Sequence, residues 1–223
     1  MVEILYSDSY IVAVNKPAGL LVHRTRIADE EHEFLLQKVR DTIQKHIYPI
    51  HRLDRPTSGI VLFALTSEAA NLFSNMIQTN EVEKEYVALV RGWFPGSVDL
   101  NYPVKNEKGN EKEAHTLFES VKTFELPIPS GRYETTRFSY IRCFPKSGRW
   151  HQLRQHLAHL RHYIINDRVH GDGKCNRFFS DYFKEKNMFL HASELTFQHP
   201  YLKTQVKIQA SLPLYWSALM EHA

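Results

Sequence analysis

The sequence predicts an α+β fold in one domain, and three observations support that prediction. Short apolar runs recur between turn signals, as is typical of strands. Residues 66–76 and 153–160 instead carry apolar side chains at helical spacing. The chain has 223 residues, of which 43% are hydrophobic and 24% charged, a composition that can bury a full core. Disorder as the main state is therefore excluded.

The expected strands are runs of β-branched and aromatic residues that end at turn-forming residues. The first run ends at Lys16-Pro17-Ala18-Gly19, and another ends at Pro145-Lys146-Ser147-Gly148. The runs cover residues 10–14, 60–65, 86–90, 138–144, 189–197 and 206–210.

Three helices are expected between and after these strands. Thr66 or Ser67 can cap the first helix, which runs through Met76. The second follows the turn at 145–148, and the third covers residues 214–220. The apolar positions at helical spacing are Ala69, Leu72, Phe73 and Met76 in the first helix and Leu153, Leu157 and Leu160 in the second.

Residues 101–132 are polar and contain three prolines and two glycines. We interpret this stretch as an inserted loop region. A linker between two domains is not favoured, because the strand signals on either side are short.

Composition and missing motifs exclude several classes of protein. Cys143 and Cys175 are far apart and form no disulfide framework, so a reducing cytoplasm is expected. No apolar run approaches the roughly 18 residues of a membrane span, and residues 1–9 show no signal-peptide pattern. The glycine-rich and nucleophile-elbow motifs of nucleotide-binding proteins and serine hydrolases do not occur.

Positive charge is concentrated in one segment. The net charge is +3, but residues 142–177 contain eight Lys or Arg side chains against two Asp. Such a segment suits a polyanionic partner. A solvated charged face explains it equally well.

The stretch His51-Arg52-Leu53-Asp54-Arg55-Pro56-Thr57-Ser58-Gly59 places one carboxylate between two arginines. Nearby cations keep a carboxylate ionised even when it is partly buried, so Asp54 can act as a nucleophile or base. The alternative is an ion pair within a loop turn.

The stretch 148–156 opens the second helix, and Arg154 follows the inward-facing Leu153. A partly buried arginine needs a carboxylate partner, and Asp54 is one candidate. An exposed basic helix is the alternative.

In residues 84–92, Tyr86, Ala88 and Val90 share one face of a strand. Tyr86 can stack on a base or handle a proton, although a core aromatic is the simpler interpretation.

Two weaker signals have ordinary explanations. His156, His159 and His162 resemble a metal-ligand cluster, but no cysteine or glutamate completes a zinc set. Contact with phosphates or with solvent is the favoured interpretation. Lys16 can contact a phosphate, although turn chemistry explains most of its surroundings.

Taken together, four stretches resemble the RluA-type pseudouridine synthase family. That family carries the motifs NKPxGxxVH, HRLDxxTSG, KxYxAxVxG and GRxHQLRxH in this order. They are present at residues 15–23, 51–59, 84–92 and 148–156, so the resemblance covers nearly the whole chain.

The resemblance implies a mixed, mainly antiparallel sheet bent around a catalytic cleft and flanked by helices. It implies one catalytic domain over residues 1–223, without a separate N-terminal RNA-binding domain, that works as a monomer. Asp54 would be the catalytic carboxylate, and Arg154 would pair with it. Tyr86 would stack on the target uracil and serve as the base for the C5 proton, and Arg52 would fill the gap left by the flipped nucleotide.

The likeness is greatest to tRNA-modifying members, which implies isomerisation of a uridine in the T stem of tRNA, at uridine 65. His51, Arg149, His151 and Gln152 would contact the RNA. The reaction needs neither a cofactor nor a metal. Three alternatives stay open: the same chemistry on ribosomal RNA, a non-catalytic RNA-binding protein, and a zinc-dependent hydrolase.

The sequence departs from the family after the last motif. Family members usually have His-Pro-Ile-x-Gly-Asp where this chain has His162-Tyr163-Ile164-Ile165-Asn166-Asp167, and His170 stands where many have Tyr. Asn tolerates positive φ, so the backbone is expected to survive the change at Asn166. These departures bear on the fit of the substrate and leave the three presumed catalytic residues intact.

Overall fold

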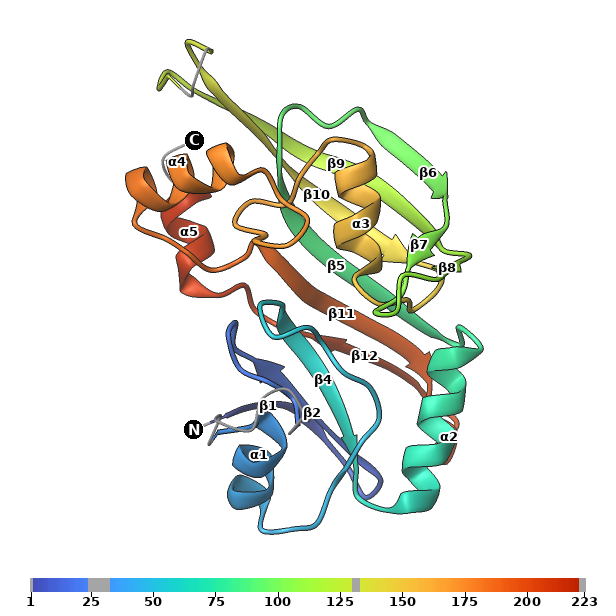
Figure 1. Cartoon of the computed structure of the whole chain (residues 1–223). Helices are drawn as coiled ribbons and strands as arrows, with labels where there is room; N and C mark the ends of the chain where they lie inside the picture. Colours follow the sequence, from blue (N-terminus) through green and yellow to red (C-terminus); the bar gives the residue numbers. More distant parts are fainter. Residues whose placement is uncertain (1, 24–32, 130–132, 221–223) are drawn as a thin grey trace. The chain divides into compact units, whose positions relative to one another are not determined.

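A computed structural model describes residues 2–23, 33–129 and 133–220. The chain forms two compact units (Figure 1): unit 1 comprises Met1–Lys84 and Ala192–Leu212, and unit 2 comprises Glu85–His191 and Pro213–Ala223. Both units combine helices with mainly antiparallel strands, which confirms the α+β class. The single catalytic domain and the bending of the sheet around a cleft stay predictions.

The strands of unit 1 follow the order β1-β2-β4-β11, with β12 on β11 and β3 on β4. Their bounds are β1 Glu3–Ser7, β2 Ile11–Lys16, β3 Tyr48–Pro49, β4 Ser58–Ala64, β11 Leu190–Gln198 and β12 Gln205–Gln209. Every residue of β4 is buried, and this strand lies between β2 and β11 in the sheet (Figure 1). The runs predicted at 10–14, 60–65 and 206–210 are confirmed.

Helix α2 (Ser67–Gln78) covers the core of unit 1. The Thr66 side chain accepts a hydrogen bond from the Ala69 N–H, which confirms the predicted cap. Phe73 packs against the strand residues Ile60 and Leu62. Leu72 is 38% exposed, so its predicted inward position is wrong. It precedes Phe73 by about 100° around the helix and falls at the edge of the apolar stripe.

The strands of unit 2 follow the order β5-β10-β9-β6, with a separate pair β7-β8. Their bounds are β5 Val82–Arg91, β6 Ser97–Asn101, β7 Val104–Lys105, β8 Glu111–Lys112, β9 His115–Leu126 and β10 Thr136–Pro145. The chain passes from unit 1 to unit 2 within β5. The runs predicted at 86–90 and 138–144 are confirmed.

The interpretation of residues 101–132 as a loop region is wrong. The stretch contains β7, β8 and the long strand β9, which pairs with β10 on one side and β6 on the other. Thr116 and Phe118 near its start and Phe124 and Leu126 near its end are buried, whereas three exposed residues lie between them. The polar middle of the strand concealed two short alternating segments.

Three helices accompany the strands of unit 2: α3 (Gln152–His159), α4 (Gly173–Phe183) and α5 (Leu214–Met220). Leu153 and Leu157 of α3 pack against Ile141 and Cys143 of β10, which confirms the predicted inward stripe. The sequence analysis missed α4, and it missed α1 (Leu35–Ile43) in unit 1.

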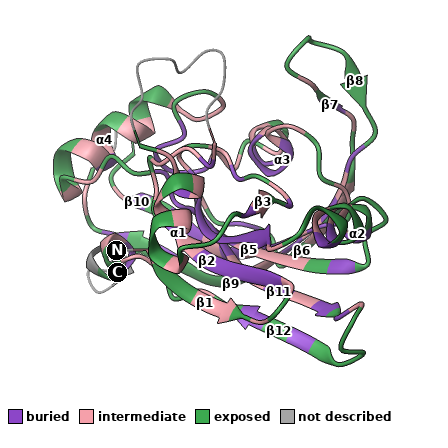
Figure 2. Cartoon of the chain, turned by 90° about the horizontal axis from the view of Figure 1, so that it is seen from below, coloured by how far each residue is buried: buried purple, intermediate pink, exposed green. Residues whose placement is uncertain are grey.

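No helix in the described part of the chain is long and apolar enough to cross a membrane. The residues of the β7-β8 pair are largely exposed (Figure 2), with Val104 as the buried exception. Both cysteines are free thiols.

Gly59 in β4 provides a test of the packing in unit 1. Its φ is +110°, and a Cβ there would lie 2.2 Å from the Ala192 carbonyl oxygen of the neighbouring strand. We expect Gly59→Ala to lower the free energy of unfolding by at least about 2 kcal/mol, from backbone strain and steric overlap together. Chemical denaturation measures this loss. Gly96→Ala is the control, because no atom lies within 4 Å of its added methyl; equal stability of the two variants would contradict the prediction.

Candidate active site

Asp54 lies in the loop between β3 and β4 of unit 1. The Thr57 N–H donates to the Asp54 carbonyl oxygen at 3.0 Å, which closes a turn over residues 54–57. Leu53 before it and Thr57 after it are buried, whereas Asp54 is half-buried. The loop is therefore fixed on both sides of a carboxyl group that solvent can reach.

Lys16 ties this loop to the turn that follows β2. The Lys16 side chain is fully buried, and its Nζ donates to the carbonyl oxygens of Pro17, Leu20 and Arg55 at 2.8–3.1 Å. The Gly19 N–H donates to the Arg55 carbonyl, and Arg55 Nε donates back to the Gly19 carbonyl, both at 2.9 Å. The turn chemistry suggested for Lys16 is confirmed, and contact of this group with a phosphate is ruled out by its burial.

The environment of Lys16 changes its protonation. Burial lowers the pKa of Lys16 to about 7, although the carboxylate of Asp54 acts in the opposite direction. Lys16 and Asp54 are thus electrostatically coupled within unit 1.

The side chain of His51, close to Asp54 in the sequence, forms a hydrogen bond with the backbone of β4. Its Nε2 accepts a hydrogen bond from the Leu62 N–H at 3.1 Å. Burial lowers the pKa of His51 to about 4, and the charge of Lys84 acts in the same direction. The ring is neutral at pH 7 and supports β4, so its predicted contact with RNA would not involve a charge. Arg52 beside it is exposed.

Tyr86 lies on β5 in unit 2, opposite Cys143 of β10. Tyr86 is half-buried and packs against the cluster that contains Ala88 and Val90, whereas Val87 and Leu89 belong to a different cluster. The predicted face of this strand is confirmed. Leu153 of α3 lies in the same cluster as Ala88, so one apolar cluster supports both Tyr86 and this helix.

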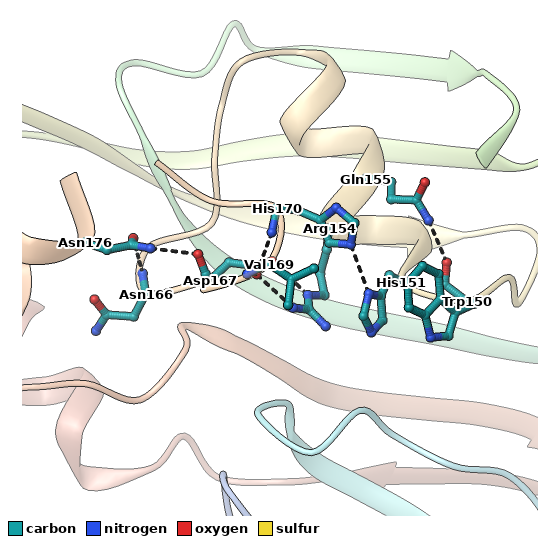
Figure 3. A network of polar contacts seen from close by, with 9 residues as sticks. All are labelled: Trp150, His151, Arg154, Gln155, Asn166, Asp167, Val169, His170 and Asn176. Atoms are coloured by element: carbon teal, nitrogen blue, oxygen red, sulfur yellow. Dashed lines mark hydrogen bonds and ion pairs between the residues drawn. The ribbon is translucent and has the colours of Figure 1, made fainter. Parts of the chain in front are cut away.

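Arg154 on α3 is buried, so the alternative of an exposed basic helix is wrong. Its Nε and Nη2 each donate to a different oxygen of Asp167 at 2.7 Å (Figure 3). The exposed fractions of the two side chains are 3% and 1%. Burial alone would raise the pKa of Asp167. The hydrogen bonds and charge of Arg154, with the N–H groups of His170 and Val169, outweigh it and hold that pKa below its usual value.

The sequence analysis therefore found Arg154 but missed Asp167. Asp54 belongs to unit 1 and Arg154 to unit 2, so their pairing stays a prediction. The available signal for Asp167 was the general need of a buried arginine for a carboxylate. That need does not select among the acids of the chain, and Asp167 is separated from Arg154 by the end of a helix.

The start of α3 gathers the remaining predicted residues of unit 2. Gln152 is buried, and both ends of its amide bind the protein: Oε1 accepts from Ser147 Oγ, and Nε2 donates to the His115 carbonyl. His151 is half-buried, and its Nδ1 lies 2.9 Å from His170 Nε2. Arg149 is exposed. Arg149 Nε donates to the Glu113 carbonyl oxygen at 3.1 Å, so Arg149 keeps an exposed side chain with one contact to the protein, whereas the contacts of Gln152 give it an internal role.

His156 and His159 lie in α3 and His162 lies beyond its end, and each has a partner in the protein; Nδ1 of His162 lies 3.0 Å from the Arg91 carbonyl oxygen. His156 is fully buried between the Tyr102 carbonyl and the Thr116 hydroxyl, so contact of His156 with phosphates is wrong. His159 stacks on Tyr102. The described residues include no group of three or more His, Cys, Asp or Glu side chains that could hold a metal ion.

The basic segment 142–177 is less uniform than its composition indicates. Arg142 lies 2.6 Å from Glu85 and 3.6 Å from Glu119, and Arg154 is neutralised by Asp167. The exposed basic side chains are Lys146, Arg149, Arg161, Arg168, Lys174 and Arg177. These six remain available to a polyanion on the surface of unit 2.

Asn166 tolerates positive φ, as the sequence analysis expected of an asparagine at this position. Asn166 adopts φ +63°, in the left-handed region that favours glycine. Its side chain also donates to the carbonyl oxygens of Glu185 and Asn187, each at 3.0 Å. The substitution therefore adds two contacts that a glycine cannot make.

Comparison with known proteins identifies the family of the chain. A family model described as RNA pseudouridylate synthase matches residues 10–159, so the chain belongs to the RNA pseudouridylate synthase family. The four sequence motifs predicted this family correctly.

Individual relatives cover nearly the entire chain. A tRNA pseudouridine synthase C of Vibrio cholerae is 46% identical over 99% of this chain and 95% of its own length. The protein of the same name in Haemophilus influenzae is 44% identical over 99% and 97%. The solved structure of human RNA Pseudouridylate Synthase Domain Containing 1 has a TM-score of 0.76 at 23% identity, over 98% of this chain and 86% of that one. The last comparison supports the fold.

The buried ammonium group of Lys16 predicts a particular pH dependence. Its pKa is about 7 in the folded chain and about 10.4 in an unfolded one. Between these values the unfolded chain binds one more proton, so stability rises with pH. We expect the free energy of unfolding of the wild type to gain about 1.4 kcal/mol per pH unit over Lys16→Met between about pH 7.5 and 9.5.

Urea denaturation at several pH values measures this difference. Lys207→Met is the control, because the Lys207 side chain is 56% exposed in its ion pair with Glu194 and should show no comparable slope. If the difference in the free energy of unfolding between wild type and Lys16→Met stays constant or falls as the pH rises, Lys16 is not buried as a neutral amine.

Proposed function

We propose that this protein isomerises a uridine of tRNA to pseudouridine, at uridine 65 in the T stem. The observation that carries the proposal is the full-length similarity to proteins named tRNA pseudouridine synthase C, together with an intact Asp54 in its loop. The target position rests on resemblance alone.

Asp54 is proposed as the catalytic carboxylate. The reaction breaks the bond from the sugar to N1 of uracil, turns the base, and joins the sugar to C5; C5 loses its proton and N1 takes one up, so the product is an isomer of the substrate. A carboxylate can serve by attacking the sugar or the ring, or by removing a sugar proton. Lys16 and Thr57 fix the backbone around Asp54, which supports a reactive group held in one orientation.

Tyr86 and Arg154 are proposed to complete the site. Tyr86 would stack on the uracil and accept the C5 proton. Arg154 would keep Asp54 ionised through the edge of the guanidinium that includes Nη1, since Nε and Nη2 bind Asp167. The proposal requires that Asp54, Tyr86 and Arg154 meet around one base.

The residues proposed to contact RNA are chosen because solvent can reach their side chains. Arg52, Arg149 and His151 are proposed to contact the RNA directly, and Arg52 would fill the gap left by the flipped nucleotide. Removing a base from its stack costs a few kcal/mol. The exposed basic side chains on unit 2 can offset this cost through phosphate contacts.

The test is Asp54→Asn, assayed with tRNA isolated from cells that lack this protein. We expect the rate of pseudouridine formation to fall by about 10³-fold or more, because an amide neither attacks nor accepts the proton. Binding of tRNA should change by less than about 3-fold. Carbodiimide labelling detects the product, and release of tritium from C5-labelled uridine gives the rate.

Asp41→Asn is the matched control, because Asp41 is an exposed residue of α1 in the same unit. Full activity of Asp54→Asn would remove this carboxylate from the mechanism. Product on a ribosomal RNA fragment but not on tRNA would assign the same chemistry to the other substrate. Binding without product on either RNA would leave a non-catalytic RNA-binding protein.

A further inference from the structure

The carboxylate of Asp167 receives four donors in the interior of unit 2 (Figure 3). Arg154 supplies Nε and Nη2, each at 2.7 Å. The backbone N–H groups of Val169 and His170 donate to Oδ1 at 2.9 and 3.0 Å. This side chain therefore joins α3 to the turn that follows it.

Two parallel hydrogen bonds determine the plane of the Arg154 guanidinium, which a single contact would leave free to rotate. Burial makes the pairing obligatory, because an unpaired buried arginine is costly. Asp167 thus sets both the position and the orientation of the group proposed to hold Asp54 ionised.

The backbone of Asp167 is itself held from α4. Asn176 Nδ2 donates to the Asp167 carbonyl oxygen at 2.7 Å, and Asn176 Oδ1 accepts from the Asn166 N–H at 2.8 Å. Asn166 in turn donates to the carbonyl groups of Glu185 and Asn187. One amide on α4 and one in the turn therefore fix the turn from two sides.

Close packing shows how little this turn can move. A Cβ on Gly171 would lie 2.1 Å from the Asp167 carbonyl oxygen and 3.0 Å from Asn176 Nδ2. The Asp172 carboxylate at the start of α4 receives Arg91 Nη1 from the end of β5 at 2.6 Å. The segment that contains Asp167 is thus attached to both β5 and α4.

We propose that Asp167 is a positioning residue for pseudouridine formation, acting through Arg154, and that Asn176 supports it. This inference rests on the proposed function and deepens it. Asp167 touches neither RNA nor the reacting atoms in this scheme. Its removal should therefore slow the reaction while leaving tRNA binding intact.

The principal experiment is Asp167→Asn, measured as a single-turnover rate on the same tRNA. We expect a fall of about 100-fold, the loss typical of a reacting group displaced by about 1 Å. The dissociation constant for tRNA should change by less than about 3-fold. A rate within about 3-fold of wild type, or a loss found only in binding, would overturn the proposal.

A double-mutant comparison separates positioning from a purely structural role. Arg154→Lys cannot make the paired contact with Asp167. If Asp167 acts through Arg154, adding Asp167→Asn to Arg154→Lys should slow the reaction by much less than 100-fold. Additive losses would mean that Asp167 acts elsewhere, and would count against the proposal.

Asn176→Ala covers the case in which Asp167→Asn does not fold. It removes the contact to the Asp167 carbonyl and the contact from the Asn166 N–H, and it leaves both side chains of the ion pair in place. We expect about a 10-fold slower reaction with unchanged binding; an unchanged rate in this folded variant would overturn the proposal. Glu125→Gln is the control, because Glu125 forms an ion pair with Arg137 that is 37–49% exposed.

The wild type separates this inference from the proposed function. If wild-type protein forms no pseudouridine on tRNA, the proposed function fails at that point. If the wild type is active and Asp167→Asn is equally active, the proposed function stands and only the inference about Asp167 falls.

Discussion

The site depends on how the protein neutralises a guanidinium that it has removed from water. Leu153 and Leu157 pack α3 into an apolar cluster. Arg154 lies between them on the same helix and is therefore buried as well. Desolvating a charged pair costs several kcal/mol per ion, which good geometry and further hydrogen bonds must offset. Asp167 supplies that geometry, and the N–H groups of Val169 and His170 saturate its second oxygen. The same contacts that make burial tolerable also remove the rotational freedom of the arginine.

Unit 1 also contains a buried basic side chain, Lys16, but its partners are backbone carbonyl groups. Lys16 is as deeply buried as Arg154, but three carbonyl groups surround its Nζ in place of a paired carboxylate. Carbonyl groups compensate the charge incompletely, so the pKa of Lys16 falls to about 7. An amine on a flexible stem suits this task, because its donors can reach both the turn after β2 and the loop that contains Asp54. In unit 1 the buried Lys16 side chain fixes the backbone around it, whereas in unit 2 the buried Arg154 side chain is itself fixed by the carboxylate of Asp167.

Helix capping, helical spacing and apolar runs in the sequence predicted the helices and strands that depend mainly on local residues. The Thr66 cap and the spacing of Ala69, Phe73 and Met76 place α2 correctly, and an uninterrupted apolar run identifies β4. In β9 the exposed residues in the middle of a long strand break the alternation, so the pattern fails. For α4, Asp172 caps the helix, but only Phe179 is buried, and a single buried position gives no periodic signal. Among the proposed site residues, motif order indicated Asp54, Tyr86 and Arg154. Asp167 could not be chosen, because nothing local indicates which acid meets a buried arginine.

The side chain of Asn166 makes the turn that contains Asp167 depend on the stretch that follows α4. A glycine at this position would need only its own backbone freedom, whereas Asn166 uses the carbonyl groups of Glu185 and Asn187. The stretch that follows α4 thereby becomes a neighbour on which the turn of Asp167 relies. An insertion or deletion between residues 184 and 188 would displace these two carbonyl groups and so disturb the turn of Asp167 from outside.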